Sequence, residues 1–102
     1  MNRFQCVAVI TSREAVRYTP AGIPMVNLDL QLESQQREAG LDRLVSLEMT
    51  ALGAGNISVE LSQAELGKTY QFTGFLARKH RNSRSLAFHI TDIEPYSLDT
   101  GA

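Results

Sequence analysis

In the segment MVNLDLQLE, residues 25–33, apolar and polar side chains alternate without a break from Val26 onward. Successive side chains of a β-strand point to opposite faces of the sheet, so an alternating segment has one apolar face and one polar face. One face carries Val26, Leu28, Leu30 and Leu32, and the other carries Met25, Asn27, Asp29, Gln31 and Glu33. We therefore predict a strand that is buried on one side and open to solvent on the other.

Four further segments repeat this period of two, over residues 3–12, 43–52, 69–78 and 85–94. Gly74 interrupts the third of them, and a glycine inside a strand often marks a bend or a bulge. A period of two throughout the chain indicates an all-β protein. We expect its core to contain Val26, Leu28, Leu30, Val45, Leu47, Phe72, Leu76, Phe88 and Ile90.

The segments between these strands carry turn and loop signals. Residues 19–24 hold two prolines and a glycine, residues 35–42 are polar and include Gly40, and residues 78–85 form a charged connection. A short helical segment is expected after Asn56, ending near Gly67. Five strands with at most one short helix fit the OB-fold, a Greek-key barrel. A five-stranded sandwich and an SH3-like barrel remain alternatives. Residues 1–96 form the predicted domain, and residues 97–102 a short flexible tail.

Composition narrows the class of protein. The chain has 102 residues, a formal net charge of −1 and one cysteine, Cys6. A single cysteine excludes an internal disulfide framework and favours a reducing compartment. No apolar run reaches the roughly 20 residues that a membrane span needs. These features predict a cytoplasmic protein without a membrane partner. Any nucleic-acid site must then come from local charge.

The chain offers little for catalysis. Cys6 lies on the expected inward face of the first strand, where it would be a small buried hydrophobe. His80 and His89 are nine residues apart, one in a loop and one on a strand. Neither paired cysteines nor a glycine-rich phosphate loop is present. We expect no enzyme activity, no cofactor and no metal site.

Local charge is more informative. Arg78, Lys79, Arg81 and Arg84 lie close together with His80 among them, and no acidic residue interrupts them. They occupy the expected connection between the last two strands, a loop that contacts oligonucleotides in many OB-folds. Long cationic side chains suit a repeating phosphate backbone. The alternative is a solvated hairpin tip whose charges keep the sheet edge soluble.

Other residues could extend this site. Arg17 and Tyr18 precede the proline turn and could supply a phosphate contact and a stacking ring, or form a strand end with Tyr18 packed on the surface. Arg43 begins the third strand and could line the same groove, and His89 is either a base contact or an ordinary surface histidine. The chain has no tryptophan, and among its phenylalanines Phe75 alone falls clearly on an outward position. Affinity for nucleic acid should therefore depend mainly on charge.

The segment from Arg17 to Pro24, with the strand that follows it to Glu33, resembles the primosomal replication protein N family of bacteria. The resemblance continues through Glu38-Ala39-Gly40, the stretch from Gly74 to Ala77 and the segment from Ile90 to Ile93. It implies an OB-fold homodimer that binds single-stranded DNA and partners the restart helicase and other primosome proteins. Leu41 and Ser46 fall where some members carry exposed stacking aromatics, and Glu33 where some carry a basic residue.

The sequence therefore predicts a non-catalytic DNA-binding accessory of replication restart. Its predicted nucleic-acid site consists of Arg17, Tyr18, Arg43, Ser46, Lys79, His80, Arg81 and Arg84. Two alternatives stay open. The chain could be mainly a protein-interaction adaptor with weak DNA binding, since stacking aromatics are scarce and the net charge is near zero. It could also be an RNA-binding OB module, because stacking and phosphate contacts distinguish the two sugars poorly.

Overall fold

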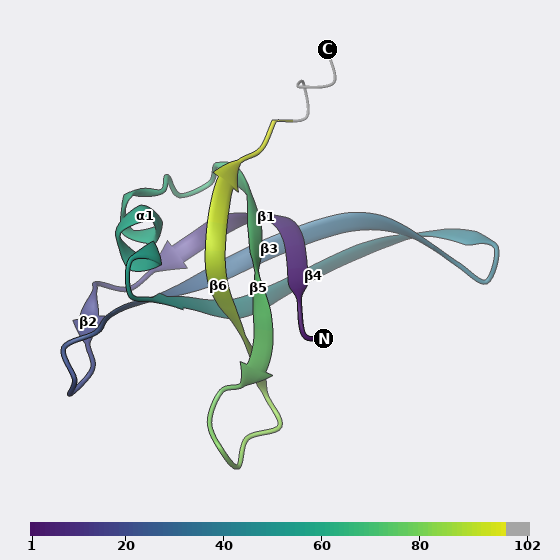
Figure 1. The fold of residues 1–102 in the computed structure, drawn as a ribbon. Coiled ribbons are helices and arrows are strands. Elements are labelled where there is room, and N and C mark those ends of the chain that lie inside the picture. Colours follow the sequence, from purple (N-terminus) through teal and green to yellow (C-terminus); the bar gives the residue numbers. More distant parts are fainter. Residues whose placement is uncertain (98–102) are drawn as a thin grey trace.

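Five long strands, one two-residue strand and one short helix make up the fold (Figure 1). A computed structural model describes residues 1–97. The elements are β1 (Phe4–Arg13), β2 (Arg17–Tyr18), β3 (Pro24–Glu38), β4 (Leu41–Ala54), α1 (Ile57–Gln63), β5 (Thr69–Arg78) and β6 (Leu86–Pro95). Of the predicted tail over residues 97–102, residues 98–102 lie outside the described part of the chain.

The long strands close into a barrel. β1 pairs with β5, β5 with β6, β6 with β4, β4 with β3, and β3 again with β1. All of these pairings are antiparallel except the short contact between β4 and β6. The short strand β2 pairs only with β3. A closed five-stranded barrel with one short helix confirms the predicted fold class.

The core is built from the apolar faces of these strands. Its fully enclosed side chains include Ile10, Val26, Leu30, Phe72 and Phe88. Helix α1 contacts β3, β4 and β6 and adds Leu61, which is also fully buried. The Arg13 guanidinium donates hydrogen bonds to the Leu61 and Ala64 carbonyls, at 3.0 and 2.5 Å. This link ties β1 to the C-terminal end of the helix, where carbonyls lack partners within the helix.

The prediction of a loop over residues 35–42 is wrong. β3 and β4 continue their pairing as far as Glu38 and Leu41, and only Ala39 and Gly40 form the turn. Both turn residues have positive φ, 53° and 77°, which a two-residue hairpin turn of this hand requires. The polar residues 35–42 carry no apolar alternation that would indicate a strand. This part of the β3–β4 hairpin extends beyond the barrel, so neither of its faces packs on the core. Figure 1 shows this arm, residues 33–46, projecting from the barrel.

Two residues that were predicted to lie in the core, Val45 and Leu47, lie outside it for the same reason. Leu47 keeps 38% of its surface exposed, and Val45 is only half-buried. Both lie at or near the arm, where the strands have already left the barrel. Leu76 is half-buried and packs against the core, whereas the other predicted core residues are buried. Alternation thus identified the correct face, but not where the barrel ends.

The predicted irregularity at Gly74 is present. The β5–β6 register shifts between Thr73 and Gly74, which is a β-bulge. A Cβ at Gly74 would overlap the His89 carbonyl oxygen, so the two backbones can approach this closely only at glycine. The extra residue is Thr91 of β6, opposite the step from Thr73 to Gly74, so the bulge bends β6 where it pairs with β5.

The difference between barrel and arm can be measured with one matched pair of variants. Leu30→Ala removes a fully buried side chain and should lower the free energy of unfolding by about 2–5 kcal/mol. Leu47→Ala, on the same face of the β3–β4 hairpin, should cost about 1 kcal/mol or less in the monomer. Urea unfolding followed by circular dichroism measures both, at a protein concentration low enough for the chain to be monomeric. Equal losses of stability in the two variants would contradict the placement of Leu47 outside the core.

Candidate nucleic-acid interface

A groove of about 370 Å³ runs over the outward face of β3 and β4. It exists because the β3–β4 register sends alternate side chains out of the barrel, where no other layer covers them. The segment after β1 forms one wall, and the base of the β5–β6 loop contributes to the other. Its lining residues are Ser12, Glu14, Arg17, Met25, Asn27, Leu28, Asp29, Thr50, Ala51, Leu52, Lys79 and Ala87.

Two predicted DNA-binding residues, Arg17 and Lys79, line this groove together. Arg17 pairs with Met25, an outward residue of β3, so its side chain shares the outer face. The Lys79 amide donates to the Ser85 carbonyl at 2.9 Å and closes the base of the β5–β6 loop. Residues far apart in the sequence thus supply two cations to one groove.

The groove also contains two carboxylates, each engaged by a neighbour. The Ser12 hydroxyl donates to Asp29 at 2.6 Å, and the Asn27 amide donates to Glu14 at 3.3 Å. These bonds hold the carboxylates but leave their charge in place. The groove floor is therefore mixed in charge, and a strongly cationic surface is found only farther along, at the β5–β6 loop.

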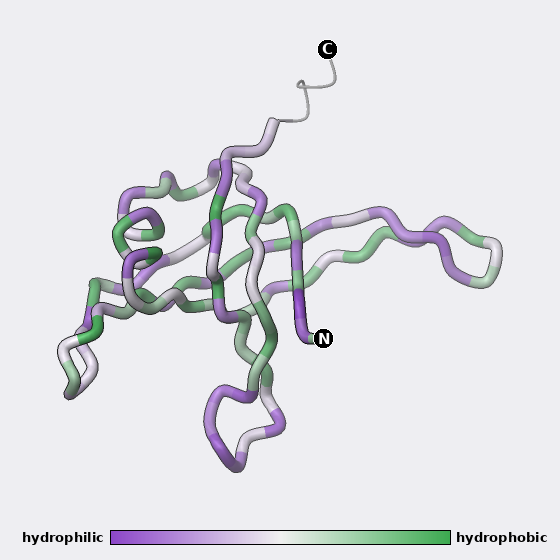
Figure 2. The backbone as a smooth tube through the Cα atoms, viewed as in Figure 1, coloured by the Kyte–Doolittle hydropathy of each residue, from purple (hydrophilic) through white to green (hydrophobic). Residues whose placement is uncertain are grey.

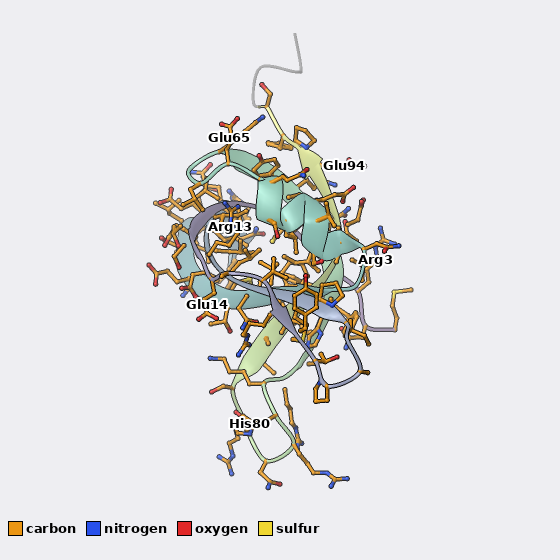
Figure 3. The ribbon with its side chains drawn as sticks, turned by 90° about the vertical axis from the view of Figure 1, so that its left-hand side faces the viewer. Arg3, Arg13, Glu14, Glu65, His80 and Glu94 are labelled. Carbon is orange, nitrogen blue, oxygen red and sulfur yellow. The ribbon has the colours of Figure 1, made fainter. Side chains whose placement is uncertain are left out.

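The β5–β6 loop, residues 79–85, is exposed and cationic. Lys79, His80, Arg81 and Arg84 are all exposed, and none forms an ion pair within residues 1–97. The Arg78 guanidinium donates to the Arg81 carbonyl at 3.0 Å and so supports the loop backbone. Figure 2 shows the loop as largely hydrophilic, and Figure 3 shows its side chains, with His80 labelled, pointing away from the barrel.

Tyr18, Arg43 and Ser46 lie apart from this cationic loop. Tyr18 pairs with Pro24, so alternation sets it on the face opposite to Arg17. Arg43 belongs to the inward-facing series of β4, and its guanidinium contacts Glu38 at 2.6 Å. Ser46 faces outward on the arm, directly opposite Glu33, and accepts a hydrogen bond from the Gln31 amide at 2.9 Å.

The structure therefore joins Arg17 to Lys79 and the loop, and separates Arg43 from them. The role of all eight residues in binding nucleic acid stays a prediction. Sequence reasoning did not include the polar and apolar floor of the groove: Met25, Asn27, Thr50 and Leu52. Their outward positions in two alternating strands were the available signal.

Comparison with known proteins gives a consistent family. The model of a family described as "Another single-strand binding protein family" matches residues 2–92. Replication restart protein PriB of Nitrosomonas europaea is 33% identical over 94 residues, which cover 90% of this chain and 87% of that one. The solved structure of PriB from Ralstonia solanacearum has a TM-score of 0.88 at 42% identity, covering 95% of this chain and 99% of that one.

A more distant solved structure shares the fold. The wild-type single-stranded DNA binding protein from Thermus aquaticus has a TM-score of 0.71 at 23% identity, and the match covers 97% of this chain and 52% of that one. The closed barrel and the match to the single-strand-binding family over residues 2–92 define a protein of the single-strand-binding OB class. The chain belongs to the family of replication restart protein PriB, which confirms the resemblance predicted from the sequence.

The described residues also bear on other kinds of site. Residues 1–97 contain no group of three or more His, Cys, Asp or Glu side chains that could hold a metal ion. None of the helices in that range is both long and apolar enough to cross a membrane. Burial raises the pKa of the Cys6 thiol from 9.0 to about 11. Because a raised pKa keeps the thiol protonated at neutral pH, Cys6 is a poor nucleophile.

The state of Cys6 can be measured by alkylation, since the chain has no other cysteine. At pH 8 the thiolate fraction falls as the pKa rises, so iodoacetamide should react at least about tenfold more slowly with the folded protein than with the urea-unfolded chain. The rate of the folded protein should rise steadily as the pH is raised toward 10. Mass spectrometry over time gives both rates, and equal rates in the two states would contradict a half-buried, protonated thiol.

Proposed function

We propose that this protein is a non-catalytic accessory of replication restart that binds single-stranded DNA largely through phosphate contacts. It acts as a homodimer and bridges the restart helicase and helicase-loading components. The observation that carries the proposal is the continuity between the groove, which Arg17 and Lys79 both line, and the cationic loop that begins at Lys79. Membership of the PriB family supports the place in replication restart.

The distribution of charge favours the loop over the arm as the phosphate-binding surface. Arg37 and Arg43 on the arm contact Asp42 and Glu38, at 2.9 and 2.6 Å, so their charge is largely cancelled locally. The outward face of the hairpin also carries Glu33, Glu48 and other acids, which repel phosphates. The loop cations have no such partner in the described residues. A polyanion therefore gains most by lying along the loop and entering the groove.

Salt dependence tests this proposal directly. The Lys79→Ala, Arg81→Ala, Arg84→Ala triple variant should bind a single-stranded DNA oligonucleotide at least about tenfold more weakly at low salt. The slope of log affinity against log salt should fall by about 0.7 for each phosphate that the variant no longer neutralises. The matched control is the Arg37→Ala, Arg43→Ala double variant, which removes two arm cations and should change affinity about threefold or less.

Fluorescence anisotropy at several salt concentrations measures these affinities, with circular dichroism to verify folding. Duplex DNA and an RNA oligonucleotide of the same sequence distinguish a DNA-binding from an RNA-binding protein. If the folded triple variant binds as tightly as the parent, the loop is a solvated hairpin tip and phosphate binding by the loop is wrong. The adaptor function would then take first place. It is supported by Leu41 and Leu44, which are 70% and 69% exposed near the arm tip and offer an apolar side chain on each face of the arm to a partner protein.

The proposal of a homodimer is supported by an open strand edge on β1. Phe4–Val7 pair with β5 on one side, whereas pairing with β3 begins only at Ala8. An unpaired edge is a template for another strand. Beside it lies an apolar cleft of about 520 Å³ whose lining includes Val7, Leu32, Val45 and Leu47. A second copy of β1 related by a twofold axis would cover both features.

Sedimentation equilibrium tests the dimer. The parent should be dimeric at about 10 μM, and Leu47→Glu should shift it toward monomer because a carboxylate would then enter the apolar interface. Val59→Glu, on the exposed side of α1 at 57% exposure, is the control and should leave the dimer unchanged. A monomeric parent would contradict the homodimer. A dimeric Leu47→Glu variant would contradict only this location of the interface.

A further inference from the structure

An aromatic pair lies on the outer surface of β5 and β6. Phe75 and His89 are opposite each other in the antiparallel ladder, with ring centroids 4.9 Å apart and planes inclined by 13°. Phe75 keeps 38% of its surface exposed, and His89 is half-buried. Exposing a phenylalanine forgoes the stabilisation that burial of its ring would give. The pair thus presents an aromatic surface to solvent that the core does not use.

This pair is continuous with the groove. His89 of β6 is the neighbour of Leu52 in β4, and Leu52 is opposite Asn27 in β3. Leu52 and Asn27 both line the groove. Phe75, His89, Leu52 and Asn27 therefore form one transverse row across β5, β6, β4 and β3, all on the outward face. A ligand lying in the groove reaches the aromatic pair without crossing a strand edge.

The charges on the two sides of the aromatic pair favour binding of an anionic ligand on only one side of it along β5. Toward the loop, the outward positions after Phe75 are Ala77 and Lys79, and Lys79 lines the groove. In the other direction the outward cross-strand pairs are Thr73 with Asp92 and Gln71 with Glu94. Lys79 and the other loop cations thus lie on the loop side of the aromatic pair, and the carboxylates of Asp92 and Glu94 lie on the far side. That arrangement suits a nucleic-acid strand whose phosphates lie along the loop side of the pair. The strand would then leave the surface before it reaches the carboxylates.

The exposed tyrosine rings of the described residues are less well placed. Tyr18 is 70% exposed but lies on the face of β2 opposite to Arg17. Tyr96 is 37% exposed and follows Glu94 and Pro95, beyond the acidic end of β6. Phe75 is therefore the exposed ring that adjoins both the groove and the basic loop.

We infer that Phe75 and His89 form a nucleobase-stacking platform at one end of the groove. The inference rests on the proposed function, because it assigns a base contact to the same single-stranded DNA. Every base has an aromatic face, so such a platform accepts any sequence and adds affinity that phosphate contacts do not supply. The preferred occupant is an unpaired base, since a base within a duplex keeps its faces covered by its neighbours.

The test compares variants of one ring against two DNA probes. Phe75→Ala should weaken binding of a fluorescein-labelled oligothymidylate about tenfold, within the range measured for single base–aromatic stacks. Phe75→Tyr should restore affinity to within about twofold, because it keeps the ring, whereas Phe75→Leu should not. Tyr96→Ala is the matched control on an exposed ring outside the groove and should bind like the parent. An abasic oligonucleotide of equal length should bind the parent and Phe75→Ala alike, with the same salt slope.

Photocrosslinking gives a second readout that does not depend on a variant. An oligothymidylate with 5-iododeoxyuridine in place of thymidine should crosslink to the parent at Phe75 or His89, located by mass spectrometry. If oligothymidylate binds the parent but Phe75→Ala and Phe75→Leu bind equally well and crosslinks fall elsewhere, the platform is wrong and the proposed function stands. If the parent binds neither probe, the proposed function fails and the platform fails with it.

Discussion

The uninterrupted register between β3 and β4 is the constraint on which the rest of the structure depends. It runs from Met25 opposite Ala54 to Glu38 opposite Leu41 without a shift. Because side chains alternate along both strands, one register assigns every residue of the hairpin to a face. It directs Val26, Leu28 and Leu30 into the core and Met25, Asn27 and Asp29 into the groove. A slip of one residue would bury Asp29 and expose the leucines.

Closure of the barrel converts this hairpin into a binding surface. β1 pairs with β3 on one side and β5 on the other, while the parallel contact between β4 and β6 brings β6 beside Leu52. The bulge opposite Gly74 places the extra residue Thr91 in β6 and bends that strand where it pairs with β5. As a result, the turn around Arg17 and the loop beginning at Lys79 flank the same outward face. The groove is thus a consequence of strand pairing between segments far apart in the chain.

The electrostatics follow from position more than from composition. A net charge of −1 gives the whole molecule no attraction for a polyanion. The cations of the arm form ion pairs with carboxylates. The cations of the β5–β6 loop, in contrast, have no ion-pair partner in residues 1–97. The same near-neutral composition therefore yields one surface that tolerates phosphates and another that repels them. Attraction is local, so it should act mainly at short range and be reduced by salt.

The sequence by itself determined the all-β class, the inward and outward faces of Val26 to Glu33, the short helix and the basic loop, because alternation and charge runs are local properties of the chain. It did not determine the length of the β3–β4 hairpin, since the polar arm has no core and shows no apolar period. Nor did it show that Arg17 and Lys79 share a groove, that Tyr18 and Arg43 face elsewhere, or that Phe75 stacks on His89. Those relations were decided by tertiary structure, because they depend on which distant strands pair and in which register.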